Sequence, residues 1–218
     1  MLDAGTALLL GTRNPGKIHE IKLILGDLPL EFSSLNDFPD VAIAEENEDT
    51  YAGNAIAKAQ FYARATGVMA LADDSGLEVE ALGGAPGVIS ARYAGDNATD
   101  ADRRALLLSE LAKTASDNGP HDNRQAHNRR AQFVCAIAIA SVDGEVLNLS
   151  EGICEGMITF VPRGTSGFGY DPLFVPDGYE HTFAELSDEV KNRISHRARA
   201  LLKLRDFLIS NRTNGNVF

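Results

Sequence analysis

The sequence predicts an α/β fold: a mixed sheet with flanking helices, arranged as one domain of two lobes. In the first half, short apolar runs alternate with helical stripes, as when Ala7–Leu10 is followed by Ile18–Leu25. In the second half, the apolar run Ala131–Val142 leads into Asp143-Gly144, which is a hairpin signal. Between these halves, Thr114–Arg130 is polar and turn-rich. We therefore expect one domain over the whole chain, with an exposed connection at Thr114–Arg130.

Composition excludes several classes of protein. The chain has 218 residues, 44% hydrophobic and 23% charged, which is ordinary for a globular protein. Its net charge of −11 disfavours nucleic acid as a partner, because binding to phosphate backbones needs clustered cations. The start, MLDAGTALLLGT, carries an acid and too short an apolar run for a signal peptide, and no stretch reaches membrane-span length. Cys135 and Cys154 lack metal-ligand spacing, so we expect reduced core thiols and a cytoplasmic protein.

The first strand and helix form a candidate phosphate site. Asn14 is placed to cap the helix, and Pro15 suits its first position. Lys17 then lies in the first turn, where free N–H groups suit a phosphate. A lysine there opposes the helix dipole, so we expect it to face an anion and its removal not to destabilise the helix. The alternative is a plain strand–turn–helix with a solvated lysine, since the spacing is not that of a Walker A loop.

An acidic segment precedes the second helix. Leu30–Leu35 and Val41–Ala44 are predicted as weak strands, and Glu45-Glu46-Asn47-Glu48-Asp49 follows. Thr50 or Asp49 then caps a helix to about Thr66. The acids either stabilise the helix N-terminus or bind a hard cation. Asn54 and Lys58, one turn apart, share a face of this helix.

Adjacent carboxylates follow the next apolar run. Val68–Leu71 ends in Asp73-Asp74-Ser75-Gly76, so we expect a strand that ends in a turn, where α/β proteins bind ligands. Because side chains alternate along a strand, only one aspartate can face a cleft, and we expect the other to fasten the turn. The alternative is that both merely shape the turn. Leu77–Leu82 is predicted as a separate strand.

The second half supplies a glycine-rich loop. A helix is expected from Thr99 to about Lys113, and further strands at Glu145–Leu149, Ile153–Phe160 and Leu173–Val175. The loop Pro162–Pro172 lets a ligand approach the backbone, and its Phe168 either stacks on a base or tucks inward. His121 and His127 are expected to be solvated.

Cationic residues gather before the last helix. Ser187 and Ser195 are predicted helix caps, and the last helix offers Leu201, Leu202, Leu204 and Leu208 to the core. Lys191, His196 and Arg197 are expected to cluster, either to receive an anion or to balance neighbouring acids.

Several motifs run in a fixed order over almost the whole chain. They are Thr12–Lys17 with Glu20, Glu45 with Thr50–Ala59, Ala72–Leu77, Gly84–Gly87 with Ser90–Tyr93, Gly167–Asp171 and Ser195–Arg197. Together they resemble the inosine triphosphate pyrophosphatase (Ham1-like) family. One departure is Gly53, because the family usually has an acidic residue just before the Asn-Ala pair.

The resemblance implies an elongated mixed sheet with two lobes around a central nucleotide-binding cleft, and a homodimer. It implies hydrolysis of ITP, dITP and XTP to the monophosphate and pyrophosphate with Mg²⁺, which cleanses the nucleotide pool. The alternatives are a Maf-like pyrophosphatase of other nucleotides and a catalytically silent nucleotide-binding protein.

The resemblance also assigns roles to residues. Asp74 is the catalytic residue, which acts as the base or positions the attacking water, and Glu45 and Asp74 are the Mg²⁺ ligands. The residues expected to contact the substrate are Thr12, Arg13, Asn14, Pro15, Gly16, Lys17, Ser75, Phe168, Gly169, Tyr170, Asp171, Lys191, His196 and Arg197.

Overall fold

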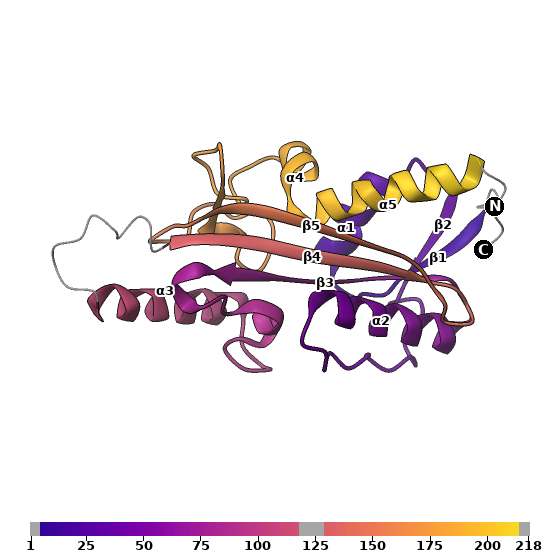
Figure 1. The fold of residues 1–218 in the computed structure, drawn as a ribbon, viewed down its shortest axis with the longest axis horizontal. Coiled ribbons are helices and arrows are strands. Elements are labelled where there is room, and N and C mark those ends of the chain that lie inside the picture. Colours follow the sequence, from indigo (N-terminus) through magenta and orange to yellow (C-terminus); the bar gives the residue numbers. More distant parts are fainter. Residues whose placement is uncertain (1–4, 118–128, 214–218) are drawn as a thin grey trace. The chain divides into compact units, whose positions relative to one another are not determined.

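The computed structural model describes residues 5–117 and 129–213, which contain a mixed sheet with flanking helices, as predicted (Figure 1). The sheet has six strands in the order β2-β1-β3-β4-β5-β6. Its strand pairs are parallel between β1 and both β2 and β3, and antiparallel between β5 and β6. The chain divides into two compact units. The first unit comprises Met1–Asp74, Cys135–Gly152 and His196–Phe218, and the second comprises Ser75–Val134 and Ile153–Ser195.

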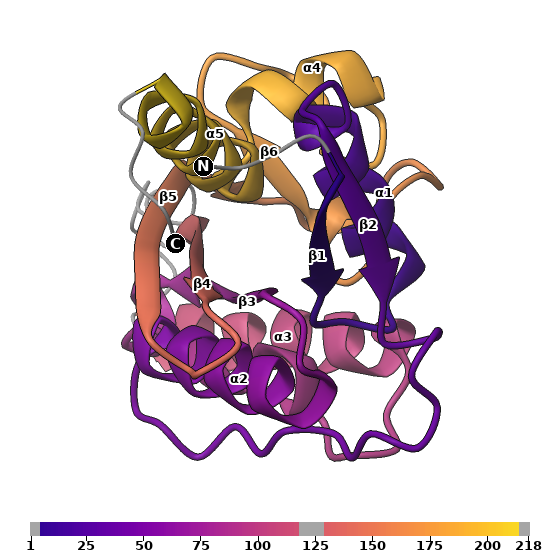
Figure 2. The same cartoon turned by 90° about the vertical axis from the view of Figure 1, so that its right-hand side faces the viewer.

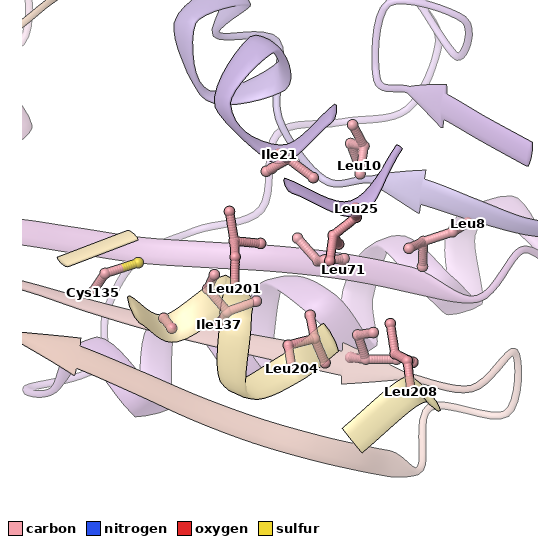
Figure 3. Packing of buried hydrophobic residues seen from close by; sticks show 12 residues of the cluster. Leu8, Leu10, Ile21, Leu25, Leu71, Cys135, Ile137, Leu201, Leu204 and Leu208 are labelled. Carbon is pink, nitrogen blue, oxygen red and sulfur yellow. The ribbon is translucent and has the colours of Figure 1, made fainter. Parts of the chain in front are cut away.

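The first unit packs helices on both faces of its strands (Figure 2). It contains β1 (Thr6–Leu10), α1 (Pro15–Leu25), β2 (Leu30–Ser34), α2 (Tyr51–Thr66) and α5 (His196–Thr213). Helices α1 and α5 cover one face and α2 covers the other. Ile21 and Leu25 of α1 pack against strand residues and α5 in a hydrophobic core (Figure 3). Leu201, Leu204 and Leu208 are buried there as predicted, whereas Leu202 is 41% exposed and the prediction for it was wrong.

The predicted turn at Asp73-Asp74 does not exist. Strand β3 runs without interruption over Ala70–Val79, so the two aspartates lie in mid-strand. The predicted strand Leu77–Leu82 is the end of β3 followed by a 3-10 turn, Glu80–Leu82. Aspartate and glycine are poor strand formers, but cations from neighbouring helices bind these carboxylates, and such contacts override local propensity.

One other strand prediction was wrong, and two predicted strands are joined into one. Val41–Ala44 forms no strand, because the Ala44 N–H donates to the Tyr62 hydroxyl (3.1 Å) rather than to a neighbouring strand. The predicted strands Glu145–Leu149 and Ile153–Phe160 are one long strand, β5 (Val146–Ile158). It follows β4 (Arg130–Ala140) after a tight turn in which Gly144 has a φ of +82°.

The second unit has its own aromatic core. Its remaining elements are the 3-10 helix Gly87–Arg92, α3 (Asp100–Asp117), the 3-10 turn Asp171–Leu173, β6 (Phe174–Pro176) and α4 (Asp188–Ile194). The ring centroid of Phe174 lies 4.7 Å from that of Phe133 and 5.1 Å from that of Phe183. These edge-on and tilted contacts pack β6 against β4 and against the segment that follows β6.

Regular elements extend into both ends of the predicted connection Thr114–Arg130. Helix α3 continues to Asp117, and β4 begins at Arg130. Arg129 is buried, and its Nε donates to the carbonyl oxygen of Ile158 (2.8 Å). His121 and His127 lie outside the described residues.

Two smaller expectations concern thiols and membranes. Cys135 and Cys154 are buried thiols and form no disulfide, as predicted. Within residues 5–117 and 129–213, no helix combines the length and apolar character needed to cross a membrane.

Candidate active site

The start of α1 is built as the sequence predicts. Asn14 caps the helix, and its Oδ1 accepts from the N–H groups of Gly16 (2.8 Å) and Lys17 (3.3 Å). The N–H of Asn14 in turn donates to Thr12 Oγ1 (3.1 Å). Arg13 points elsewhere, because its Nη2 donates to the carbonyl oxygens of Pro39 and Val41. The contacts of Arg13 therefore fasten the segment that leads to the acidic cluster.

Asp73 lies at the centre of a buried ion network. Its Oδ2 is 3.1 Å from Lys17 Nζ and 3.2 Å from Arg197 Nε, and Arg197 also pairs with Glu20. Burial alone would raise the pKa of Asp73, but the charges of Lys17 and Arg197 hold that pKa well below its usual range. Asp73 is thus a fixed anion that binds α1 and α5 to the sheet.

Arg197 is enclosed by this network. Its side chain is 3% exposed, and the carboxylates of Glu20 and Asp73 raise its pKa despite the opposing effect of burial. We predicted from the sequence that Arg197 contacts the substrate, but its burial and its two carboxylate partners favour a structural role. Lys17 differs, because 19% of its side chain remains exposed.

Asp74 faces the opposite side of β3, as strand alternation requires. Its Oδ2 accepts a hydrogen bond from Asn54 Nδ2 (2.9 Å), and its Oδ1 lies 3.6 Å from Lys58 Nζ. Burial raises the pKa of Asp74 and outweighs the lowering effect of Lys58. A carboxylate with a raised pKa is a better proton acceptor than an ordinary aspartate.

Helix α2 supplies residues that our candidate list omitted. Asn54 and Lys58 share one face of α2, as the sequence predicts, and both are buried beside Asp74. Lys58 also pairs with Glu46 (2.5 Å). Burial would lower the pKa of Lys58, but the charges of Asp74 and Glu46 raise it, so Lys58 is held as a cation. The helical spacing of Asn54 and Lys58 was the available signal.

The oxygen donors beside Asp74 suit a hard cation. Lys58 links Glu46 to Asp74, whereas the predicted ligand Glu45 accepts from Asn47 Nδ2 (2.7 Å). Among the described residues, no group of three or more histidines, cysteines, aspartates and glutamates is arranged to hold a metal. Mg²⁺ commonly takes only one or two carboxylates and completes its shell with substrate phosphates and water. Lys58 Nζ brings two carboxylates together, those of Glu46 and Asp74, and two is within the number that Mg²⁺ takes.

The second unit holds a different cluster, in the loop Gly167–Asp171. Asp171 Oδ2 accepts from the Phe168 N–H (3.1 Å) and from Lys191 Nζ (2.9 Å). Lys191 Nζ lies 5.9 Å from the centroid of the Phe168 ring, and the side chains of Lys191 and Asp171 are each 8% exposed. The structure thus brings together three predicted substrate contacts: an aromatic ring, a carboxylate and an ammonium group.

The other predicted contacts are placed differently. Tyr170 is buried, and its hydroxyl donates to the Ser90 carbonyl oxygen (3.1 Å), so its contacts support the loop. Ser75 is a half-buried residue within β3. Lys191 and Arg197 each pair with a carboxylate of their own unit, Lys191 with Asp171 and Arg197 with Asp73. His196 is the buried first residue of α5.

Comparison with known proteins identifies the family. A model of the Ham1 family matches residues 8–207. The chain belongs to the Ham1 family. A dITP/XTP pyrophosphatase of Geobacter sulfurreducens is 49% identical over 203 residues, covering 93% of this chain and 96% of that protein. A dITP/XTP pyrophosphatase of Desulforamulus reducens is 46% identical over 201 residues, covering 92% and 94%.

A solved structure shares the fold of this Ham1-family chain. The HAM1 protein from Coxiella burnetii matches with a TM-score of 0.81 and 41% identity, over 94% of this chain and 98% of that one. This likeness agrees with the match to the family model.

Proposed function

We propose that this chain hydrolyses dITP, XTP and ITP to the nucleoside monophosphate and pyrophosphate. The observation that carries the proposal is the setting of Asp74, a carboxylate with a raised pKa held by Asn54 and Lys58. Relatives that match nearly the whole chain at 45–49% identity are named dITP/XTP pyrophosphatases, which supports this substrate class.

The first unit supplies groups for the triphosphate. Lys17 retains exposed surface at the start of α1, where N–H groups and the helix dipole favour phosphate. Asp74 accepts a proton from the attacking water or orients that water toward the α-phosphorus. Lys58 and Asn54 fix the Asp74 side chain for this role. Mg²⁺, held by Asp74 with Glu45 or Glu46, would stabilise the negative charge that develops on the phosphate oxygens.

The second unit supplies groups for the base. Phe168 offers a ring for stacking, which holds any purine. Lys191 offers a cationic donor beside it, and a donor satisfies the six-position oxygen of hypoxanthine or xanthine but not the amino group of adenine. His196 is a further candidate donor to the substrate, as the resemblance to the family implies.

The deciding experiment is a product assay. The purified chain is incubated with ITP, dITP, XTP, ATP and GTP, with Mg²⁺ or with EDTA, and the products are separated by chromatography. We expect IMP and pyrophosphate from ITP, little turnover of ATP and none with EDTA. Turnover of other nucleotides alone would favour the Maf-like alternative, and binding of ITP without turnover would favour a silent nucleotide-binding protein.

Assembly and location are parts of the same proposal. We infer a homodimer, which light scattering on the purified chain tests directly. We also infer a cytoplasmic location. The free thiols of Cys135 and Cys154 support it, because cysteines stay reduced in the cytoplasm. Fractionation of cells that express a tagged chain tests that location.

A further inference from the structure

Two residues in the first two turns of α3 bind the backbone of one residue, Gly169, in the loop Gly167–Asp171. The N–H of Gly169 donates to Asp100 Oδ2 (2.7 Å), and its carbonyl oxygen accepts from Arg104 Nη1 (2.7 Å). Asp100 and Arg104 are one turn apart on α3 and therefore share a face. Both polar groups of Gly169 are thus bound by charged side chains, which form stronger hydrogen bonds than neutral ones.

The carboxylate of Asp100 is itself held in place by Arg103. Arg103 Nη1 binds the second carboxylate oxygen of Asp100, and Arg103 Nη2 donates to the Ala98 carbonyl oxygen (2.7 Å). With one oxygen held by Arg103, the other is directed at Gly169. Gly169 has a φ of +59°, a left-handed conformation that places the flanking residues on a sharp bend.

The bend separates the residues that we assign to the base. Phe168 precedes Gly169, and Asp171, which pairs with Lys191, follows two residues later. A change in the backbone at Gly169 therefore moves the Phe168 ring relative to Asp171 and Lys191. We propose that Asp100 and Arg104 are positioning residues, which set the geometry of the base-binding loop without touching the nucleotide. This inference rests on the proposed function, because that function assigns the base to this loop.

A simpler role for Asp100 can be separated from this one. An acid in the first turn of a helix is stabilised by the helix dipole wherever it points. Asp102 also lies in the first turn of α3 and has the same favourable position in the helix dipole. It accepts from the N–H and the hydroxyl of Thr99, and among the described interactions it makes no contact with the loop Gly167–Asp171. Asp102 is therefore the matched control for Asp100.

The test compares steady-state kinetics on ITP with Mg²⁺ for the parent and five variants. Asp100→Ala and Arg104→Ala are each expected to raise KM about tenfold, the equivalent of one charge-assisted hydrogen bond. We expect kcat to stay within about twofold, because the phosphate-side residues are untouched. Asp100→Asn and Arg104→Lys, which keep an acceptor and a donor, should recover most of the loss. Asp102→Ala should leave KM unchanged.

A second measurement does not depend on turnover. Amide hydrogen exchange of residues 167–171 should be faster in Asp100→Ala and Arg104→Ala than in the parent and in Asp102→Ala. The proposal is overturned if both variants keep the parental KM, or if Asp102→Ala raises KM as much as Asp100→Ala does. A parent that fails to hydrolyse ITP overturns the proposed function instead, and the exchange rates then decide alone whether Asp100 and Arg104 order the loop.

Discussion

Two adjacent aspartates of β3 should respond to the same substitution in opposite ways. Asp73→Asn removes the anion that Lys17 and Arg197 share, and Asp73 and Arg197 are only 3% and 2% exposed. Breaking a buried pair by removing one partner costs about 3–5 kcal/mol. For a chain of this size, each kcal/mol lowers Tm by roughly 2–4 °C. We therefore expect Asp73→Asn to lower Tm by about 10 °C.

Asp74→Asn should leave the fold intact and remove the activity. Burial raises the pKa of Asp74, so its charge is not a source of stability, and an asparagine can still accept from Asn54. Turnover of ITP should fall by about 10²-fold or more, as for a positioned acid–base group. Thermal unfolding followed by circular dichroism and a pyrophosphate-release assay measure the two effects. The reasoning is refuted if Asp73→Asn unfolds within about 2 °C of the parent, or if Asp74→Asn keeps activity within a few-fold.

Three further predictions concern the first unit. Lys17→Ala should raise KM for ITP. It should also lower the unfolding free energy by roughly 1.5–3 kcal/mol, contrary to the sequence-based expectation, because it removes the ion pair with Asp73. Unchanged stability in a urea titration would contradict that ion pair. Arg197→Ala should lower Tm at least as much as Asp73→Asn and leave the ITP-to-ATP activity ratio unchanged. A changed ratio in a folded variant would show instead that Arg197 contacts the base. Burial raises the pKa of Cys135 to about 12, so a thiol reagent at pH 8 should label it only after denaturation, and rapid labelling of native protein would disprove its enclosure.

The parts of the fold that were predictable from sequence depend on neighbours in the chain. Asn14, Thr50 and Ser187 cap α1, α2 and α4 as expected, because a capping side chain binds N–H groups two or three residues away. The shared face of Asn54 and Lys58 likewise follows from helical periodicity alone. Such signals need no knowledge of the rest of the fold.

The parts that were missed depend on distant partners. Asp73-Asp74 resembles a turn in sequence, and it is held in a strand by Arg197, which is 124 positions away in the chain, and by residues of α1 and α2. The same pairing buries Arg197, although a charged residue near a helix start suggests an exposed binding group. The sequence does not single out Glu46 among the acids that precede α2. Only the fold shows that Glu46 is the glutamate that reaches Lys58.

Gly53 offers the sharpest test of how the acidic segment supports Asp74. Gly53 is the third residue of α2, and a Cβ there would lie 2.9 Å from the Cβ of Glu48, too close for either atom. Glu48 cannot move alone, because its N–H donates to Asn54 Oδ1 (3.0 Å) and its carbonyl oxygen accepts from Asn54 Nδ2 (3.3 Å). Asn54 also holds Asp74, so displacement of Glu48 is transmitted to the carboxylate.

Gly53→Ala should therefore lower turnover although alanine favours helices. Alanine gains about 1 kcal/mol over glycine in a helix, and this gain should be cancelled by the contact with Glu48. A misplaced Asp74 should reduce kcat by about tenfold, since small errors in the position of a catalytic group are costly. The double variant Glu48→Gly, Gly53→Ala removes the opposing side chain and should recover activity, while Glu48→Gly alone should stay near the parent. A Gly53→Ala chain that is more stable and fully active would show that Glu48 moves aside without disturbing Asn54, and that the acidic segment does not position Asp74.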